Sequence, residues 1–206
     1  MTHKFIEKEL LIASNNKGKI LEIKELISPY GIKILSAADL NIEEPEEIGL
    51  TFKANALLKA EYYGKATGLP ALADDSGLSI EALDGFPGVY SARFAGPNRD
   101  FQEAFNLIEQ KLKEKNLESS AAFFTCALAL WWPSGDFKIF EGKLHGKVTF
   151  PAIGEFGFGY GPIFTPEGYD KTLSQIDNDE KNKISHRSLA FKQMIADCFH
   201  QNQIDI

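Results

Sequence analysis

Residues 10–27 read LLIASNNKGKILEIKELI, an apolar run followed by a polar stretch and then by apolar residues at helical spacing. This pattern predicts a strand over Leu10–Ala13, a polar loop, and a helix over Gly18–Ser28. Lys17 and Lys19 fall at the start of the predicted helix, where positive charge opposes the helix macrodipole. Either the loop is merely solvated, or a negatively charged group normally binds there. A strand, a polar loop and a helix start are suited to holding phosphate through backbone N–H groups.

The composition is that of an ordinary globular protein. The chain has 206 residues, of which 44% are hydrophobic and 25% charged, and we expect one domain over residues 1–206. With 29 acidic and 22 basic residues, a net charge of -7 argues against a nucleic-acid-coating surface but leaves room for a local basic pocket. The sequence lacks both an apolar run of about 18 residues and a signal-peptide core, so we expect a cytoplasmic protein without membrane contact. Cys126 and Cys198 are expected to be reduced and buried.

Helical and strand signals alternate along the rest of the chain, which favours an α/β fold. A buried strand at Leu69–Ala73 is expected to end in a turn over Asp74–Gly77, because Asp, Ser and Gly are common turn formers. A Pro-Ser-Gly-Asp turn at 133–136 predicts a hairpin of two long strands. The remaining strands are predicted at 32–35, 78–83, 120–133 and 137–150, and the remaining helices from Thr51, over 101–112 and over 185–199.

Two groups of carboxylates are candidates for binding a metal. Glu47 lies in the acidic stretch EEPEEIGLTF, and the pair Asp74 and Asp75 follows a buried strand in ADDSGL. Mg²⁺ usually binds one or two carboxylates and completes its shell with water and substrate phosphate. Asn55 and Lys59, four residues apart on one helix face, are expected to point toward the same site. The alternative is a plain acidic surface and an ordinary turn.

The stretch EKNKISHRSLAF at 180–191 resembles the opening loop in its chemistry. If Ser185 caps the last helix, His186 and Arg187 lie in its first turn, with Lys181 just upstream. Arginine offers a fixed fork of donors that suits phosphate or a carbonyl edge. Two cationic helix starts beside an acidic patch indicate one polyphosphate site with its metal.

The stretch FGFGYGPIF at 156–164 mixes aromatic residues with glycines. Phe158 or Tyr160 could stack on a nucleobase, while the glycines would let the backbone approach a ligand closely. The alternative is a tight, partly buried loop with aromatic residues in the core.

Six ordered motifs together resemble the inosine triphosphate pyrophosphatase family, which hydrolyses non-canonical purine nucleoside triphosphates. They are SNNKGKILEI, EEIGLTFKANALLKA, ALADDSGL, GFPGVYSARFAG, GFGYGPIF and EKNKISHR, and the resemblance runs from about Leu10 to Phe199. It implies a two-lobed single α/β domain with a long mixed β-sheet, flanking helices and an active-site cleft between the lobes, usually a homodimer. The implied reaction uses Mg²⁺ and converts ITP, dITP or XTP to the monophosphate and pyrophosphate.

The resemblance also implies roles for individual residues. Asp75 is the favoured general base, Lys59 shares the catalytic site, and Glu47 and Asp75 bind the metal. Arg187, a donor-only side chain, would favour purines that carry a 6-keto group. The substrate-binding residues implied are Ser14, Asn15, Asn16, Lys17, Gly18, Lys19, Ser76, Phe158, Gly159, Tyr160, Gly161, Lys181, His186 and Arg187.

The chain departs from the family pattern at Gly161, where the family has Asp in FGYDPIF. The lost carboxylate is an acceptor in the base-binding region. One alternative function is therefore a nucleotide-binding protein with impaired catalysis or relaxed base selectivity. Another is a related hydrolase that acts on canonical or modified pyrimidine nucleotides.

Overall fold

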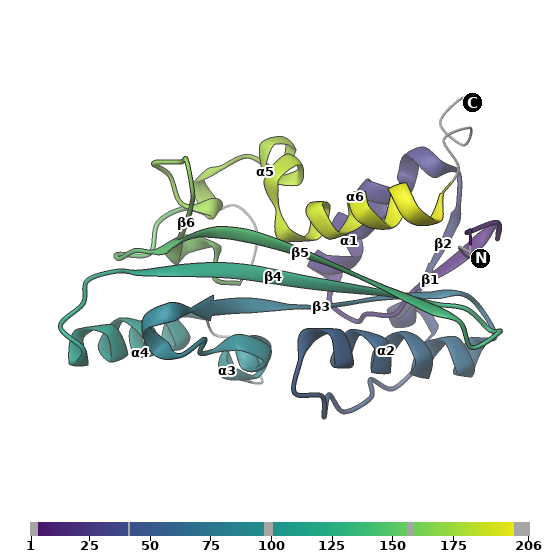
Figure 1. The fold of residues 1–206 in the computed structure, drawn as a ribbon, viewed down its shortest axis with the longest axis horizontal. Coiled ribbons are helices and arrows are strands. Elements are labelled where there is room, and N and C mark those ends of the chain that lie inside the picture. Colours follow the sequence, from purple (N-terminus) through teal and green to yellow (C-terminus); the bar gives the residue numbers. More distant parts are fainter. Residues whose placement is uncertain (1–3, 41, 97–100, 156–158, 200–206) are drawn as a thin grey trace. The chain divides into compact units, whose positions relative to one another are not determined.

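The computed structural model describes residues 4–40, 42–96, 101–155 and 159–199 (Figure 1). None of the helices in these residues is long and apolar enough to cross a membrane. The strands are β1 (Glu9–Ile12), β2 (Lys33–Ser36), β3 (Ala71–Ile80), β4 (Ser120–Trp131), β5 (Phe137–Val148) and β6 (Phe164–Pro166). The helices are α1 (Lys17–Ile27), α2 (Phe52–Thr67), α3 (Ser91–Phe94), α4 (Phe101–Glu114), α5 (Asn178–Ile184) and α6 (His186–Cys198).

The six strands form one mixed sheet in the order β2-β1-β3-β4-β5-β6. β1 runs parallel to both β2 and β3, whereas β5 and β6 are antiparallel. The predicted hairpin is confirmed: β4 and β5 meet at a tight turn in which the Trp132 N–H donates to the Asp136 carbonyl at 2.9 Å. These features confirm the predicted α/β fold with a long mixed sheet and flanking helices.

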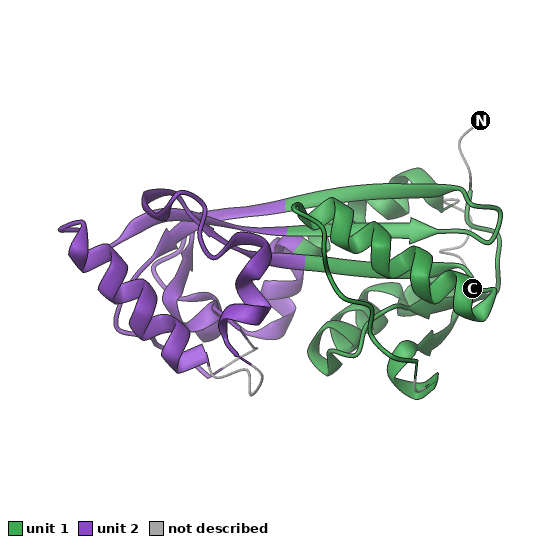
Figure 2. Cartoon of the chain, turned by 90° about the horizontal axis from the view of Figure 1, so that it is seen from below, with its two compact units in different colours: residues 1–75, 126–142, 187–206 green, residues 76–125, 143–186 purple. Residues whose placement is uncertain are grey.

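The chain forms two compact units (Figure 2). Unit 1 comprises residues 1–75, 126–142 and 187–206, and unit 2 comprises residues 76–125 and 143–186. Strands β3, β4 and β5 each contribute residues to both units.

In unit 1, helices cover both faces of the sheet (Figure 1). Helices α1 and α6 pack through large side chains such as Ile23 and Phe191 against one face, where Leu72 of β3 is buried. Helix α2 packs on the other face through Ala56 and Ala60, close to Ala73 of β3. Alternate residues of a strand point to opposite faces, so β3 divides its side chains between these two layers.

Unit 2 has its own apolar core. Helix α4 contributes Phe105 and Ile108 to this core, and β4 contributes Phe124. The rings of Phe124 and Phe164 meet edge to face at 4.7 Å, which adds a directional contact to the burial of apolar area.

The turn predicted over Asp74–Gly77 is wrong, because β3 runs unbroken through these residues. Turn-forming residues remain in a strand here because tertiary contacts outweigh local preference. Each aspartate is held by cations on its own side of the sheet. Gly77 leaves room for unit 2 backbone, since a Cβ there would lie 2.5 Å from the Gly88 carbonyl oxygen.

Candidate active site

Asp74 and Asp75, adjacent on β3, belong to different side-chain clusters. Asp75 contacts Lys59 of α2, while Asp74 contacts Lys19 of α1 and Arg187 of α6. The strand alternation that separates Leu72 from Ala73 therefore continues through the two aspartates. They are not a carboxylate pair sharing one site but the centres of two charged clusters.

The first cluster joins Lys59, Glu47 and Asp75. The Lys59 ammonium lies 2.5 Å from Glu47 Oε1 and 3.5 Å from Asp75 Oδ1, and its side chain is 5% exposed. Burial by itself lowers the pKa of Lys59, but the charges of Asp75 and Glu47 outweigh it and raise that pKa. The lysine is therefore a permanent cation between two carboxylates.

Asp75 has the properties of a base that works near neutral pH. Burial raises the pKa of Asp75 to about 6, against the opposing charges of Lys59 and Lys19. A pKa near the working pH suits general acid–base catalysis. Its Oδ2 atom is buried and accepts no hydrogen bond from any residue that the structure describes. An acceptor of this kind is left to bind a water molecule or a cation.

Glu47 and Asp75 together offer the carboxylate oxygens that a hard divalent cation prefers. Among the described residues no group of three or more His, Cys, Asp or Glu side chains gathers into a metal site. Mg²⁺ does not require such a cage, because it retains water molecules and binds substrate phosphate. With the unpartnered Asp75 oxygen, the donor set fits a divalent cation.

The second cluster is centred on Asp74, whose side chain is fully buried. Asp74 pairs with the Lys19 ammonium, accepts from Arg187 Nε at 3.0 Å and from Cys126 Sγ at 2.9 Å. Although burial by itself would raise the pKa of Asp74, the charges of Arg187 and Lys19 hold that pKa well below its usual range. Asp74 thus stays ionised and orients the two cations.

Arg187 is 3% exposed and uses Nη1 to pair with Glu22 of α1 in addition to its contact with Asp74. Two of its donors are therefore held by carboxylates of unit 1. Selection of a purine 6-keto group by Arg187 stays a prediction, and the structure adds a positioning role between α1 and α6.

The opening loop folds as a cap for α1. The Asn16 side chain accepts hydrogen bonds from the Gly18 and Lys19 backbone N–H groups at 3.0 and 3.3 Å, which makes it the N-cap. Ser14 is buried, and its hydroxyl accepts from the Asn16 N–H at 3.1 Å. Asn15 donates to the Tyr63 hydroxyl at 3.3 Å. Lys17 begins the helix, so the predicted cationic helix start is confirmed.

The predicted site residues of unit 2 occupy separate elements. Ser76 lies on β3, and Lys181 on α5 donates from Nζ to Asn178 Oδ1 at 2.9 Å. His186 is the first residue of α6 and stacks on Phe124 with ring centroids 4.9 Å apart. Their roles toward a substrate remain predictions.

The aromatic–glycine stretch is only partly described, since Phe158 lies outside the described residues. The Tyr160 ring is 3% exposed, donates from its hydroxyl to the Ser91 carbonyl at 3.0 Å, and meets Phe101 edge to face. The ring thus belongs to the core of unit 2, as the alternative interpretation has it. Gly159 has a φ of +78°, and Gly161 begins a short 3-10 helix, Gly161–Ile163.

Sequence reasoning missed three residues that organise these clusters: Asp74, Glu22 and Gly49. Asp74 was grouped with Asp75 as one carboxylate pair, although strand alternation would have separated them. Glu22 is three residues after Lys19 on α1, a spacing that places both on one helix face. The backbone N–H of Gly49 donates to Asn55 Oδ1, and no pattern in the sequence indicates this contact.

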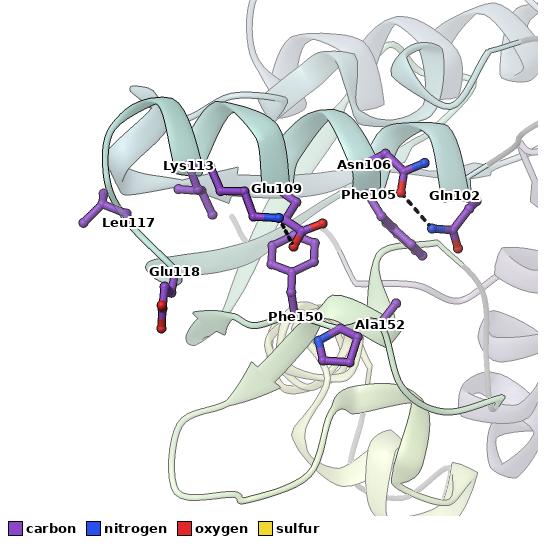
Figure 3. A pocket seen from close by; sticks show the side chains of 11 residues that line it. Gln102, Phe105, Asn106, Glu109, Lys113, Leu117, Glu118, Phe150 and Ala152 are labelled. Atoms are coloured by element: carbon purple, nitrogen blue, oxygen red, sulfur yellow. Dashed lines mark hydrogen bonds and ion pairs between the residues drawn. The ribbon is translucent and has the colours of Figure 1, made fainter.

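Unit 2 also contains a pocket of about 390 Å³ beside α4 (Figure 3). Phe105 and Phe150 line it, and the Glu109–Lys113 ion pair lies among its lining residues. None of the predicted site residues in the described part of the chain lines this pocket. The candidate site is therefore assigned to the charged clusters and not to the pocket.

The chain is similar to known proteins over most of its length. A dITP/XTP pyrophosphatase of Zymomonas mobilis is 49% identical over 92% of this chain and 91% of the relative, and one of Ruegeria pomeroyi is 48% identical over 97% and 99%. The solved structure of a HAM1 protein from Coxiella burnetii superposes with a TM-score of 0.85 at 38% identity, covering 92% of this chain and 98% of that one. The Ham1 family model matches residues 10–197. The chain therefore belongs to the Ham1 family.

Proposed function

We propose that the protein hydrolyses non-canonical purine nucleoside triphosphates, namely ITP, dITP and XTP, to the monophosphate and pyrophosphate. One observation carries the proposal: a buried lysine lies between two carboxylates, one of which has a pKa of about 6 and an unpartnered oxygen. The two relatives described above, each named dITP/XTP pyrophosphatase, supply the substrate class.

In the proposed mechanism, separate residues activate the attacking water, hold the carboxylates in place and bind the phosphates. Asp75 accepts a proton from the attacking water, for which its raised pKa is suited. Lys59 keeps Asp75 and Glu47 in place and neutralises part of their charge. Lys19, which Asp74 orients near the start of α1, binds phosphate oxygens, and the helix macrodipole favours negative charge at this end of the helix. Charge stabilisation and positioning are the main contributions to phosphoryl-group chemistry.

We propose Mg²⁺ as the cofactor, bound by Glu47 and Asp75. When bound, the cation would neutralise charge on the phosphates and on the departing pyrophosphate. The buried, unpartnered Asp75 oxygen supports this assignment, as does the all-oxygen donor set.

The test is pyrophosphate release with Mg²⁺ over a panel of ITP, dITP, XTP, GTP, ATP and dUTP. Fast release confined to the first three nucleotides is the expected result. The matched control is Asp75→Asn, which keeps the side-chain shape and removes the base, and should reduce release strongly. Absence of release from every nucleotide, or equal release by Asp75→Asn, would refute the proposal.

One observation favours a second candidate, a nucleotide-binding protein with weakened catalysis or base selectivity. Gly161 provides no side-chain acceptor, and a Cβ at this position would lie 2.5 Å from Ser174 Oγ. The space that a side chain would need is thus partly filled by Ser174. Binding of ITP without turnover would favour this candidate, whereas rapid and selective turnover would exclude it.

We further propose that residues 1–206 act as one cytoplasmic domain and form a homodimer. The match of a single family model across both units supports one domain, and two buried free cysteines are consistent with a reducing compartment. The homodimer rests on the resemblance of the motifs. Light scattering during size-exclusion chromatography should give twice the chain mass, and a monomer mass would refute the dimer.

A further inference from the structure

Ile42 packs against the apolar core of unit 1, but nearer to Glu47 the segment has little apolar burial to hold it in place. Residues 42–49 form neither helix nor strand. Ile48 and Leu50 are 72% and 82% exposed, so apolar burial does not anchor the chain on either side of Gly49. The position of the Glu47 carboxylate must therefore depend on specific polar contacts.

Asn55 of α2 makes one such contact. Its side chain is fully buried, and its Oδ1 accepts a hydrogen bond from the Gly49 backbone N–H at 2.7 Å. Because the partner is a backbone donor, this contact fixes which end of the amide carries the oxygen. A Cβ on Gly49 would overlap Asn55 Oδ1, so a glycine is needed for the segment to approach α2 this closely.

Asn55 and Lys59 lie one helical turn apart on α2 and hold neighbouring parts of the same segment. Lys59 contacts the Glu47 carboxylate, and Asn55 contacts the backbone two residues later. We propose that Asn55 is a positioning residue that holds this segment against α2 and so places Glu47 beside Lys59 and Asp75. This inference rests on the proposed function only where it concerns catalysis.

The Nδ2 group of Asn55 supports the proposal that this residue is present for its contact with Gly49. Nδ2 is buried and donates to no residue that the structure describes. Leaving a buried donor unpaired destabilises the folded state, so a position that only filled space would be better occupied by an apolar residue. The contact with Gly49 gives a reason for the asparagine.

The first experiment tests the hydrogen bond between the Gly49 N–H and Asn55 Oδ1 without measuring enzyme activity. Hydrogen exchange of the Gly49 amide is followed in the wild type, Asn55→Ala, Asn55→Asp and Leu50→Ala. We expect Asn55→Ala to accelerate exchange at least about tenfold, because the acceptor is lost. Asn55→Asp keeps the acceptor and should retain protection, and Leu50→Ala should exchange like the wild type. Wild-type protection in Asn55→Ala would overturn the proposal, as would an equal loss in Leu50→Ala.

The second experiment tests whether Asn55 acts through Glu47, using a double-mutant cycle with pyrophosphate release as the readout. Asn55→Ala should lower kcat/KM by about 10–100-fold and raise the Mg²⁺ concentration needed for half-maximal rate. In the Glu47→Gln background the same change should cost less than about threefold, because the carboxylate it positions is already gone. An undiminished cost there would show a merely structural role and overturn the proposal.

The two experiments separate this inference from the proposed function. If the wild type hydrolyses no nucleotide, the proposed function fails, while hydrogen exchange at Gly49 still decides whether Asn55 holds the segment. If nucleotides are hydrolysed but Asn55→Ala leaves both exchange and kcat/KM unchanged, only the inference about Asn55 fails.

Discussion

Replacing Asp75 by Asn should make the protein more stable while removing its activity. A pKa of about 6 in the folded chain, against 3.8 for an ordinary aspartate, is a difference of about two units. At about 1.36 kcal/mol per unit, ionised Asp75 costs the folded state about 3 kcal/mol. For a chain of this size that corresponds to a melting temperature about 6–12 °C higher in Asp75→Asn.

The stability that Asp75→Asn gains over the wild type should depend on pH, and its sign follows from the raised pKa of Asp75. Below about pH 4 the aspartate is protonated in both the folded and unfolded chain, so Asp75→Asn gains nothing. Between about pH 4 and 6 the unfolded chain loses this proton first, and the folded wild type becomes relatively less stable. Above about pH 6 the full difference is present.

The assay is thermal unfolding followed by circular dichroism in EDTA at several pH values from 4.5 to 8, for Asp75→Asn and the wild type. Asp74→Asn is the matched control, because it makes the same change one residue away. Asp74 has a pKa held well below its usual range, so its loss should destabilise the protein by about 3–5 kcal/mol at pH 7. The reasoning is refuted if Asp75→Asn is no more stable than the wild type at pH 8, or if its gain does not change with pH.

Three further predictions concern the metal, the base region and the arginine. Removing divalent cations with EDTA should abolish pyrophosphate release, and Mg²⁺ should restore it; release that persists in EDTA would contradict the metal site. Gly161→Asp should shift the ratio of ITP to GTP turnover but cost about 1–3 kcal/mol of stability, because its Cβ meets Ser174 Oγ at 2.5 Å; adding Ser174→Ala should recover most of that stability in urea unfolding. Arg187→Lys should destabilise the protein by about 2 kcal/mol or more, since one ammonium cannot reproduce the contacts of Nε with Asp74 and of Nη1 with Glu22; an unchanged urea midpoint would contradict this.

Local patterns in the sequence were sufficient where the apolar periodicity was clear. The strand and the helix around residues 10–27 follow from an apolar run and from apolar residues at helical spacing. The hairpin at Pro133–Asp136 is equally local. Such elements are specified by residues that are neighbours in the chain, so propensity and tertiary structure agree.

The failures arose where distant residues decide the local structure. The stretch Asp74–Gly77 has the composition of a turn, yet each aspartate pairs within a strand with cations from α1, α2 or α6. The contact between Gly49 and Asn55 likewise depends on how an irregular segment crosses a helix. Neither can be derived from spacing, because the partners meet only after the chain has folded.

The alternation of β3 makes strand register a requirement for chemistry as well as for packing. A slip of one residue against β1, whose Ile12 pairs with Leu72, would exchange the two aspartates between the faces of the sheet. The carboxylate with the raised pKa would then meet Arg187, and its neighbour would meet Lys59. The size pattern of the preceding residues opposes this slip, because the large Leu72 fits the α1 and α6 layer while the small Ala73 fits beneath α2. A larger side chain at position 73 would therefore weaken the preference for the native register. The aspartate beside Lys59 could then change from Asp75 to Asp74, although no charged group had been altered.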